Sequence, residues 1–296
     1  MIKIQRIIFL KMLFLVLFSA NNTWALDTVK ITNSESMAND KRSLHKKEVI
    51  KRALELTTPE YGAYAFQTMN VVMNRHRALP IVIQGKISNI YVAAASEEWD
   101  KKTIAIKIPI RAGLLNYRLL LVNKNDLPTF AQVKSLDDLR KLTAGLRAGW
   151  VTSDVFKKAK IPLVETQNFD GLFSLLNMHR FNYIPRAIYE IFDELSARQS
   201  FLPNVVIEPS LAIYLPMPTY VYVSPAEPRL AQRLEKGLKI MLKNGELHQI
   251  LRKYYADDIE RANLKNRTII KIHNPYFKDQ HLLSDESLWY PLQTNQ

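Results

Sequence analysis

Three polar side chains, Asn182, Tyr183 and Arg186, lie close together and have the types best suited to binding a ligand in this chain. Arginine offers a planar fork of donors that matches a carboxylate or a phosphate, and tyrosine can stack on a ring. All three stand near the end of a predicted strand over residues 181–184, where open α/β sheets bind ligands. The alternative is that Tyr183 and Arg186 only cover a core, with Arg186 paired to Glu190 one helical turn later.

A second candidate site follows another predicted strand, over residues 143–148. Trp150, Thr152 and Ser153 come directly after it and lead into a predicted helix over residues 155–159. Backbone N–H groups at a helix start are free to bind an anion, so this segment is a candidate anion site. The sequence leaves open the alternative that these residues form an ordinary helix cap.

No catalytic motif is legible in the sequence. The chain has no cysteine, which excludes disulfides and thiolate chemistry, and its six histidines have no metal-ligand spacing. We therefore expect no cofactor, no metal and no catalysis. If the protein were nevertheless an enzyme, the candidate acids and bases would be Glu97, Glu98, Asp154 and His179.

The elements that must position these residues alternate between strands and helices, which indicates a largely parallel sheet with helices on both faces. Pro185 is expected to end the strand before it, so that Arg186 opens the next helix. The expected strands are residues 28–32, 63–69, 87–95, 113–122, 143–148, 181–184, 204–208 and 267–272, with two short pieces in 211–223. The expected helices are residues 45–56, 75–82, 136–142, 155–159, 169–176, 188–195 and 224–243, with a further helix from 247.

The N terminus is typical of a secretory signal. Lys3 and Arg6 precede an apolar run over residues 12–18, and Ala25 offers a small residue for cleavage. No later run reaches about 18 apolar residues, so the sequence predicts an exported protein with its signal, residues 1–25, removed. The net charge of +13 is scattered without a nucleic-acid motif, and we expect no nucleic-acid partner.

The order of these parts resembles the family 3 extracellular solute-binding proteins. The matching pieces are VAAASEEW, GLLNYRLLLV, SLDDLRKL, AGLRAGWVTSD, FDGLFSLLNMHRFNYIPRA and the closing TYVYVSPAEPRLAQRLEKGLKIMLKNGELHQILRKYY. More narrowly, the chain resembles a divergent subgroup with an FxYxPR stretch. The resemblance implies the two-lobed type II fold of periplasmic binding proteins, with mixed sheets flanked by helices and two crossing strands as a hinge. Lobe 1 would contain residues 26–113 and 220–296, and lobe 2 residues 114–219.

The resemblance also implies a periplasmic protein that captures a small polar solute between its lobes. The partner would be an ABC importer permease or a membrane sensor, and the protein a monomer. Rival interpretations are a dehydratase-like enzyme on the same scaffold and an interaction module that has lost its ligand.

The ligand anchors of that family are altered in this chain. Trp99 and Ser96 stand where amino-acid receptors carry an arginine and threonines, and Asn182 replaces an aspartate. We therefore expect no free amino acid to bind in the usual way. Arg111, Arg147 or Arg186 would supply a cation instead, and Trp99, Trp150 or Tyr183 would stack on the ligand.

Overall fold

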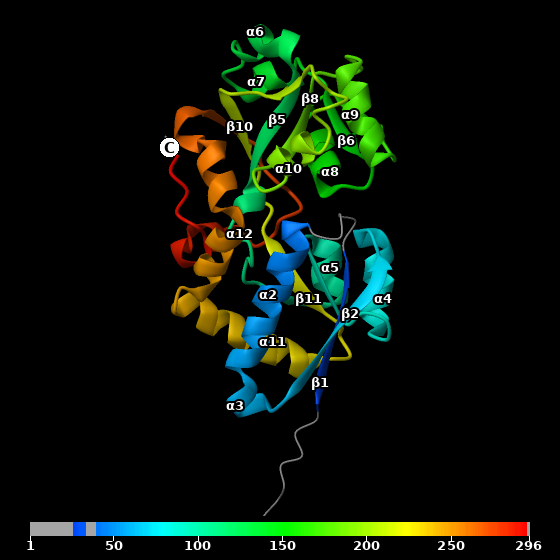
Figure 1. Cartoon of the computed structure of the whole chain (residues 1–296), viewed down its shortest axis with the longest axis vertical. Coiled ribbons are helices and arrows are strands. Elements are labelled where there is room, and N and C mark those ends of the chain that lie inside the picture. Colours follow the sequence, from blue (N-terminus) through cyan, green and yellow to red (C-terminus); the bar gives the residue numbers. More distant parts are fainter. Residues whose placement is uncertain (1–25, 34–39, 295–296) are drawn as a thin grey trace, which may run out of the picture.

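The protein has two lobes, each built on its own β-sheet. A computed structural model describes residues 26–33 and 40–294, and Figure 1 shows one lobe above the other. The expected signal, residues 1–25, lies outside the described residues. Within the part of the chain that the structure describes, no helix combines the length and the apolar character needed to cross a membrane.

The lower lobe in Figure 1 contains a five-stranded sheet of order β2-β1-β3-β11-β4. β1, β2 and β3 are parallel, whereas β11 runs antiparallel to β3 and β4. Its strands are β1 (Asp27–Asn33), β2 (Tyr64–Val72), β3 (Ile90–Ala94), β4 (Ile104–Ile106) and β11 (Thr219–Val223). Its helices are α2 (Lys41–Leu56), α3 (Thr58–Tyr61), α4 (Arg75–Gln84), α5 (Glu97–Lys102) and α11 (Pro228–Lys243).

Side-chain alternation along the strands divides this lobe into two cores. Val221 and Val223 of β11 pack with α2 and α11, while Tyr220 and Tyr222 pack with α4 and α5 on the other face. A strand with apolar side chains on both faces needs helices on both faces. The structure confirms the expected helices on both faces, but the expected largely parallel sheet is wrong, because β11 runs antiparallel to β3 and β4 here and β5 (Tyr117–Asn123) runs antiparallel to its neighbours in the other lobe.

The upper lobe contains a seven-stranded sheet. Six of its strands follow the order β12-β10-β5-β8-β6-β7, and the seventh, β9, pairs with β5. A single core holds it together. Its strands are β5 (Tyr117–Asn123), β6 (Ala144–Arg147), β7 (Leu163–Thr166), β8 (Tyr183–Ala187), β9 (Val205–Ile207), β10 (Leu211–Tyr214) and β12 (Thr268–Lys271). Its helices are α6 (Leu127–Phe130), α7 (Leu136–Leu139), α8 (Val151–Lys158), α9 (Phe169–Asn177) and α10 (Ile191–Ser196).

The expected end of a strand at Pro185 is wrong. β8 runs through the proline, which lies opposite Leu120 of β5, so Arg186 belongs to the strand and not to a helix. β6 joins β8 only at Tyr183, which leaves the far side of β8 open beside Pro185. The missing N–H of the proline therefore removes no hydrogen bond from the ladder.

Three segments connect the lobes. The chain crosses at residues 107–116 and 215–218, and α12 (Glu246–Ala262) packs Leu247 on the lower lobe but Leu251 and Tyr255 on the upper one. β12 then pairs with β10 in the upper sheet, where Ile270 is buried. The expected assignment of residues 220–296 to lobe 1 alone is therefore wrong for β12. The other lobe bounds stay a prediction.

Candidate functional site

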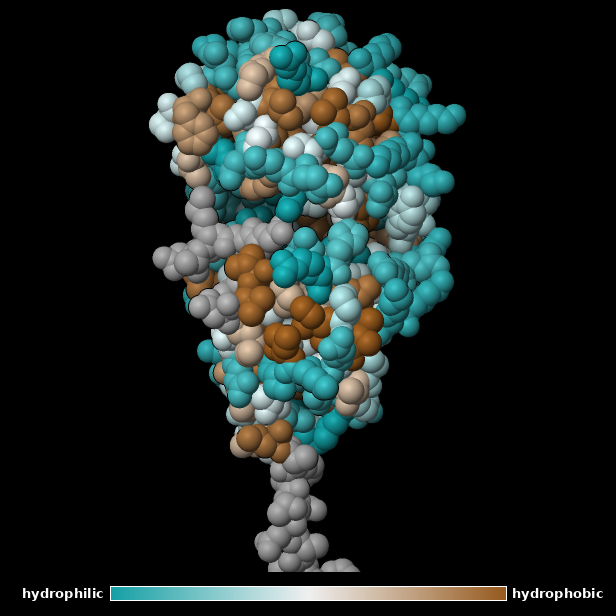
Figure 2. Space-filling view, turned by 90° about the vertical axis from the view of Figure 1, so that its right-hand side faces the viewer, coloured by the Kyte–Doolittle hydropathy of each residue, from teal (hydrophilic) through white to brown (hydrophobic). Residues whose placement is uncertain are grey.

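A cavity of about 470 Å³ lies between the two lobes. Figure 2 shows the recess at mid-height, where one lobe faces the other. Both lobes and both crossing segments contribute to its walls. The lining residues are Arg42, Met73, Asn74, Arg75, His76, Tyr91, Ala94, Leu115, Arg118, Arg147, Ala148, Gly149, Trp150, Val151, Thr152, Gln167, Phe169, Arg186, Glu190 and Met217.

Positively charged side chains outnumber negatively charged ones in this lining. Arginines contribute five of its side chains, and Glu190 is the only acidic residue among the described residues that line it. Apolar and aromatic side chains, including Met73, Trp150, Phe169 and Met217, form much of the remaining wall. The cavity thus combines cationic donors with surface suited to an apolar body.

Arg118 lies near the first residue of β5, where the chain enters the upper lobe. Its side chain is 3% exposed, and it donates to the sulfur of Met217 at 3.4 Å across the two crossing segments. Its Nε is buried with no hydrogen-bond partner among the described residues. Burial lowers the pKa of the Arg118 guanidinium to about 10, partly offset by Glu190, so the group stays charged at neutral pH.

Arg186 is a buried ion-pair residue beside the same cavity. Its Nε and Nη2 donate to the two carboxylate oxygens of Glu194, each at 2.6 Å, and Nη2 also lies 3.0 Å from Glu190. The guanidinium covers the Trp150 ring at 4.6 Å. Two acids already accept from this arginine, so its fork is largely occupied.

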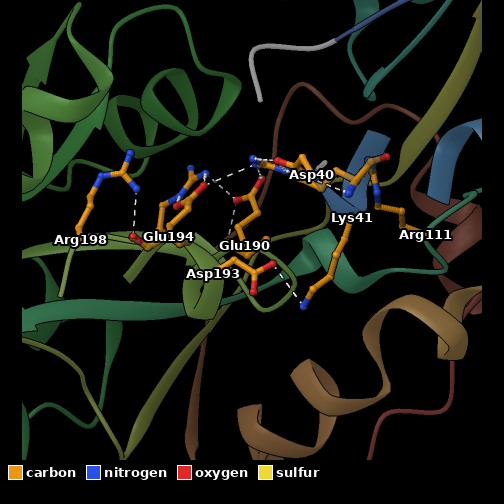
Figure 3. A network of polar contacts seen from close by, with 10 residues as sticks. Asp40, Lys41, Arg111, Glu190, Asp193, Glu194 and Arg198 are labelled. Atoms are coloured by element: carbon orange, nitrogen blue, oxygen red, sulfur yellow. Dashed lines mark hydrogen bonds and ion pairs between the residues drawn. The ribbon is translucent and has the colours of Figure 1, made fainter. Parts of the chain in front are cut away.

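Ion pairs cross from α2 of the lower lobe to the region of α10 in the upper lobe (Figure 3). Arg42 pairs with Glu190 at 3.2 Å and Glu194 at 3.5 Å, while Lys41 pairs with Asp193 at 3.2 Å. Burial opposes ionisation of Glu190, but Arg186 and Arg42 outweigh it and hold its pKa below the usual range. Burial raises the pKa of Glu194, whose charge is also opposed by Glu190.

Two side chains of α4 complete the lower wall. Arg75 donates to Ser96 Oγ at 2.5 Å, and burial lowers the pKa of its guanidinium. The Nε2 of His76 lies 3.1 Å from the carbonyl oxygen of Gly149, which belongs to the upper lobe. Gly149 has φ +81°, and an added Cβ would lie 2.9 Å from His76 Nε2. A glycine therefore permits this close approach of the lobes.

The structure brings some of the residues expected from the sequence to this cavity. Trp150, Thr152 and Arg186 line it, and Ser96 lies beside it through its contact with Arg75. No side chain caps α8, whose first turn contains Thr152. The helix begins four residues earlier than expected, at Val151, which brings that first turn to the cavity wall.

Other expected residues do not line the cavity. Trp99 is 1% exposed and stacks on Tyr91 in the lower core, with ring centroids 5.2 Å apart, so its expected role as a ligand platform is wrong. Ser153 donates to the carbonyl oxygen of Arg147 at 3.0 Å. Arg111 donates to the carbonyl oxygen of Arg42 at 3.2 Å and covers a tyrosine ring.

Asn182 and Tyr183 also lie away from the cavity because they belong to the opposite end of β8. Tyr183 pairs with Val122, far along β5 from its first residue, and is fully buried. Asn182 Oδ1 accepts from the Thr143 amide at 2.8 Å. The strand begins later than expected, so Tyr183 opens it and Asn182 directly precedes it.

The side chains named as possible acids and bases do not converge in the cavity. Glu97 and Glu98 pair with lysines on the exposed face of α5, at 2.7 and 2.9 Å. His179 pairs with Asp126 at 3.4 Å, while Asp154 lines a hollow that adjoins the cavity and also contains Glu97 and Glu98. Among the described residues, no group of three histidine or acidic side chains could hold a metal.

Sequence reasoning missed Arg118, Arg42 and Arg75. A signal for Arg118 was present, because a lone charge inside the apolar stretch GLLNYRLLLV is costly to bury without a purpose. Arg42 lies before the expected helix over residues 45–56, whereas α2 begins at Lys41 and contains it. The side chain of Asp40 accepts from the backbone N–H of Arg42 and caps this helix.

Comparison with solved structures places this architecture in a known fold. An ancestral arginine-binding protein bound to glutamine aligns with 78% of this chain and 99% of its own, at 17% identity and a TM-score of 0.55. A histidine kinase sensor domain with similarity to periplasmic binding proteins aligns with 77% of this chain and 96% of its own, at 14% identity and a TM-score of 0.54. This chain has the fold of a periplasmic binding protein.

A third periplasmic-binding-protein fold comes from work on glutathione import via GshT and the cystine ABC importer TcyBC of Streptococcus mutans. It covers 78% of this chain and 96% of its own, at 16% identity and a TM-score of 0.54. No family model and no curated protein sequence matches this chain. The cavity described above therefore lies between the lobes of a periplasmic-binding-protein fold.

Proposed function

We propose that the protein is a non-catalytic, monomeric periplasmic solute-binding protein that holds a small polar ligand between its lobes. The observation that carries this proposal is the cavity of about 470 Å³ lined by both lobes and by the two segments that connect them. A ligand in that position contacts both lobes at once, so binding favours the closed arrangement by hinge motion.

The partner that we propose is an ABC importer permease or a membrane sensor. Similar folds include the substrate-binding protein of an amino acid ABC transporter, with 13% identity and a TM-score of 0.51, and the histidine kinase sensor domain. The proposed periplasmic location also rests on residues 1–25. N-terminal sequencing of the exported protein should begin near Leu26, and a mature protein that retains Met1 would contradict export with cleavage.

The direct test combines ligand recovery with a measurement of shape. The mature chain is purified under native conditions, and any retained small molecule is identified by mass spectrometry after denaturation. Adding that molecule back to stripped protein should raise the melting temperature and reduce the radius of gyration in small-angle X-ray scattering. Turnover of the molecule would favour the enzyme, and a chain that retains and binds nothing would favour the interaction module.

We further propose that free amino acids do not bind in the way usual for the resembling family. Glu190 is the only acid among the described lining residues, and arginines already occupy it. A thermal-shift screen of the common L-amino acids tests this proposal. Stabilisation by several degrees, with a dissociation constant near 1 μM for any of them, would contradict it.

A further inference from the structure

We infer that the ligand of this cavity is a small organic carboxylate without an ammonium group, held by the guanidinium of Arg118. This inference rests on the proposed function, because it names the class of solute that the cavity takes. Its support is the state of Arg118, of Glu190 and of the wall around them.

The first observation is that Arg118 is a buried cation whose donors are poorly used. Its guanidinium donates to the Met217 sulfur at 3.4 Å, a weak acceptor, and its Nε has no hydrogen-bond partner among the described residues. The charge of Glu190 compensates Arg118 without a hydrogen bond between these two described side chains. Burying a charged group without partners costs several kcal/mol, which a fold tolerates where the group serves binding. The side chain borders the cavity, so a ligand carboxylate can accept from the fork that the protein leaves empty.

The second observation concerns Glu190, the acidic residue of the described cavity lining. Glu190 Oε1 accepts from Arg42 at 3.2 Å, and its Oε2 lies 3.0 Å from Arg186 Nη2 and accepts from the Ala187 amide at 3.2 Å. Both oxygens are therefore occupied by the protein. An ammonium group on the ligand would find no free carboxylate in the described lining, and the surrounding arginines would repel it.

The third observation separates a carboxylate from a bare inorganic anion. The cavity holds about 470 Å³ and has Met73, Tyr91, Trp150 and Phe169 in its walls. Apolar and aromatic walls favour an organic body, because its burial there removes apolar surface from water. An inorganic phosphate would use the cation and leave these walls without a contact.

The experiment uses the mature chain, stripped of bound molecules by reversible unfolding, with defined probes. Succinate, glutarate and benzoate are compared with succinamide, glutaramide and benzamide, and with inorganic phosphate and L-glutamine, by thermal shift and calorimetry. We expect at least one carboxylate to bind while its matched amide does not. Arg118→Met should weaken that binding about 10- to 100-fold, the range set by a charge-assisted hydrogen bond.

The ligand-free protein distinguishes an anchor from a structural residue. Removing a poorly paired buried charge should leave the melting temperature of Arg118→Met equal to that of the wild type or higher. Arg118→Lys, which keeps the charge without the planar fork, provides a second variant and should bind with intermediate affinity. Arg140→Met is the matched control, because Arg140 lies in the same lobe and pairs with Asp137 at 2.6 Å away from the cavity. Its affinity should equal that of the wild type.

Several results would overturn the inference. These are equal binding of a carboxylate and its amide, tighter binding of L-glutamine than of any carboxylate, or binding of phosphate alone. Unchanged carboxylate affinity in Arg118→Met, or no stabilisation of the wild type by any carboxylate at about 1 mM, would also overturn it. A neutral or zwitterionic molecule recovered from native purification that closes the lobes would support the proposed function and overturn only this inference.

Discussion

Two buried arginines, one in each lobe, differ in how much of their hydrogen-bonding capacity the protein uses. Arg233, on α11, is completely buried, and its guanidinium donates to Asp27, to Thr57 and to three backbone carbonyl oxygens at 2.7 to 3.3 Å. Arg118 is almost as buried but has a sulfur as its acceptor and an unpaired Nε. We call Arg233 saturated, because acceptors occupy its donors, and Arg118 unsaturated, because its Nε has no acceptor among the described residues.

This difference indicates which arginine maintains the fold and which one is available to a ligand. A saturated guanidinium ties together the elements that supply its acceptors, so its loss leaves several polar groups unpaired. An unsaturated one contributes little to the folded state on its own, and its interaction energy becomes available when a ligand binds. The following predictions test this distinction, from the largest expected effect to the smallest.

The largest effect is expected for Arg233→Met. The substitution leaves buried carbonyl groups without donors and removes one of the two arginines that pair with Asp27. We expect the free energy of unfolding to fall by about 3–5 kcal/mol, measured by urea denaturation. Arg118→Met, measured in parallel without ligand, should lose nothing. A loss smaller than about 1 kcal/mol in Arg233→Met would remove the basis of the comparison.

A smaller effect is expected for Lys46, a third buried cation, whose Nζ donates to the carbonyl oxygen of Thr32 at 3.1 Å. Burial, with the nearby charge of Arg111, lowers the pKa of Lys46 to about 7. In the unfolded chain the lysine has its ordinary pKa of about 10. Between about pH 7 and pH 10 the unfolded chain therefore binds more protons than the folded protein, and the free energy of unfolding rises with pH. We expect a rise of about 2 kcal/mol from about pH 7 to about pH 9, relative to Lys46→Met.

Denaturation of both proteins across this pH range measures the difference. The free energy of unfolding should rise and not fall with pH, because burial penalises the charged form of Lys46 and so lowers its pKa in the folded protein. Parallel pH profiles for the wild type and Lys46→Met would show that Lys46 keeps an ordinary pKa.

The pairs between the lobes should have a smaller effect on stability and a larger one on shape. Arg42→Met removes the contacts of α2 with Glu190 and Glu194. Because the Arg42 side chain is partly exposed, we expect a loss of about 1 kcal/mol. We also expect the radius of gyration of the ligand-free protein to increase as the lobes separate. Adding Glu190→Gln to Arg42→Met should lower the free energy of unfolding only slightly further. If the losses from the two single substitutions instead sum to that of the double variant, Arg42 and Glu190 are not energetically coupled.

The smallest effect is expected at an exposed pair. Lys102 lies 2.9 Å from Glu98, one helical turn earlier on α5, and both side chains are about half exposed. Lys102→Met should change the free energy of unfolding by no more than about 0.5 kcal/mol, and high salt should abolish the difference. A larger loss would show that exposed pairs also maintain this fold, which would weaken the contrast between saturated and unsaturated cations.

Most of the elements were predictable because they depend on short-range patterns. The alternation in TVKIT predicted β1, and the apolar stripe after residue 45 predicted most of α2. Element ends were less predictable where contacts from elsewhere decide them. The strand at Pro185 continues because β6 pairs with that side of β8 only at Tyr183, a fact that lies in the sheet and not in the local sequence.

The candidate site divides in the same way. Trp150 and Thr152 were identified because a helix start after a strand has a local signature, and both line the cavity. Arg186 also lines it, although the strand end expected at Pro185 is wrong. Trp99, Asn182 and Tyr183 were chosen on equal grounds but lie in cores or at the far end of a strand. Side-chain type and spacing do not say whether a residue faces a core or a cavity.

The sequence by itself determined the alternation of strands and helices, and its resemblance to the family 3 solute-binding proteins predicted the two-lobed architecture. The tertiary structure alone decided which cations are saturated. Arg186 finds Glu194 eight residues later, Arg42 finds Glu190 across the lobes, and the one hydrogen-bond acceptor of Arg118 among the described residues is a sulfur. The reason is physical: the cost of a buried charge depends on acceptors within a few ångströms, and folding brings these together from distant parts of the chain.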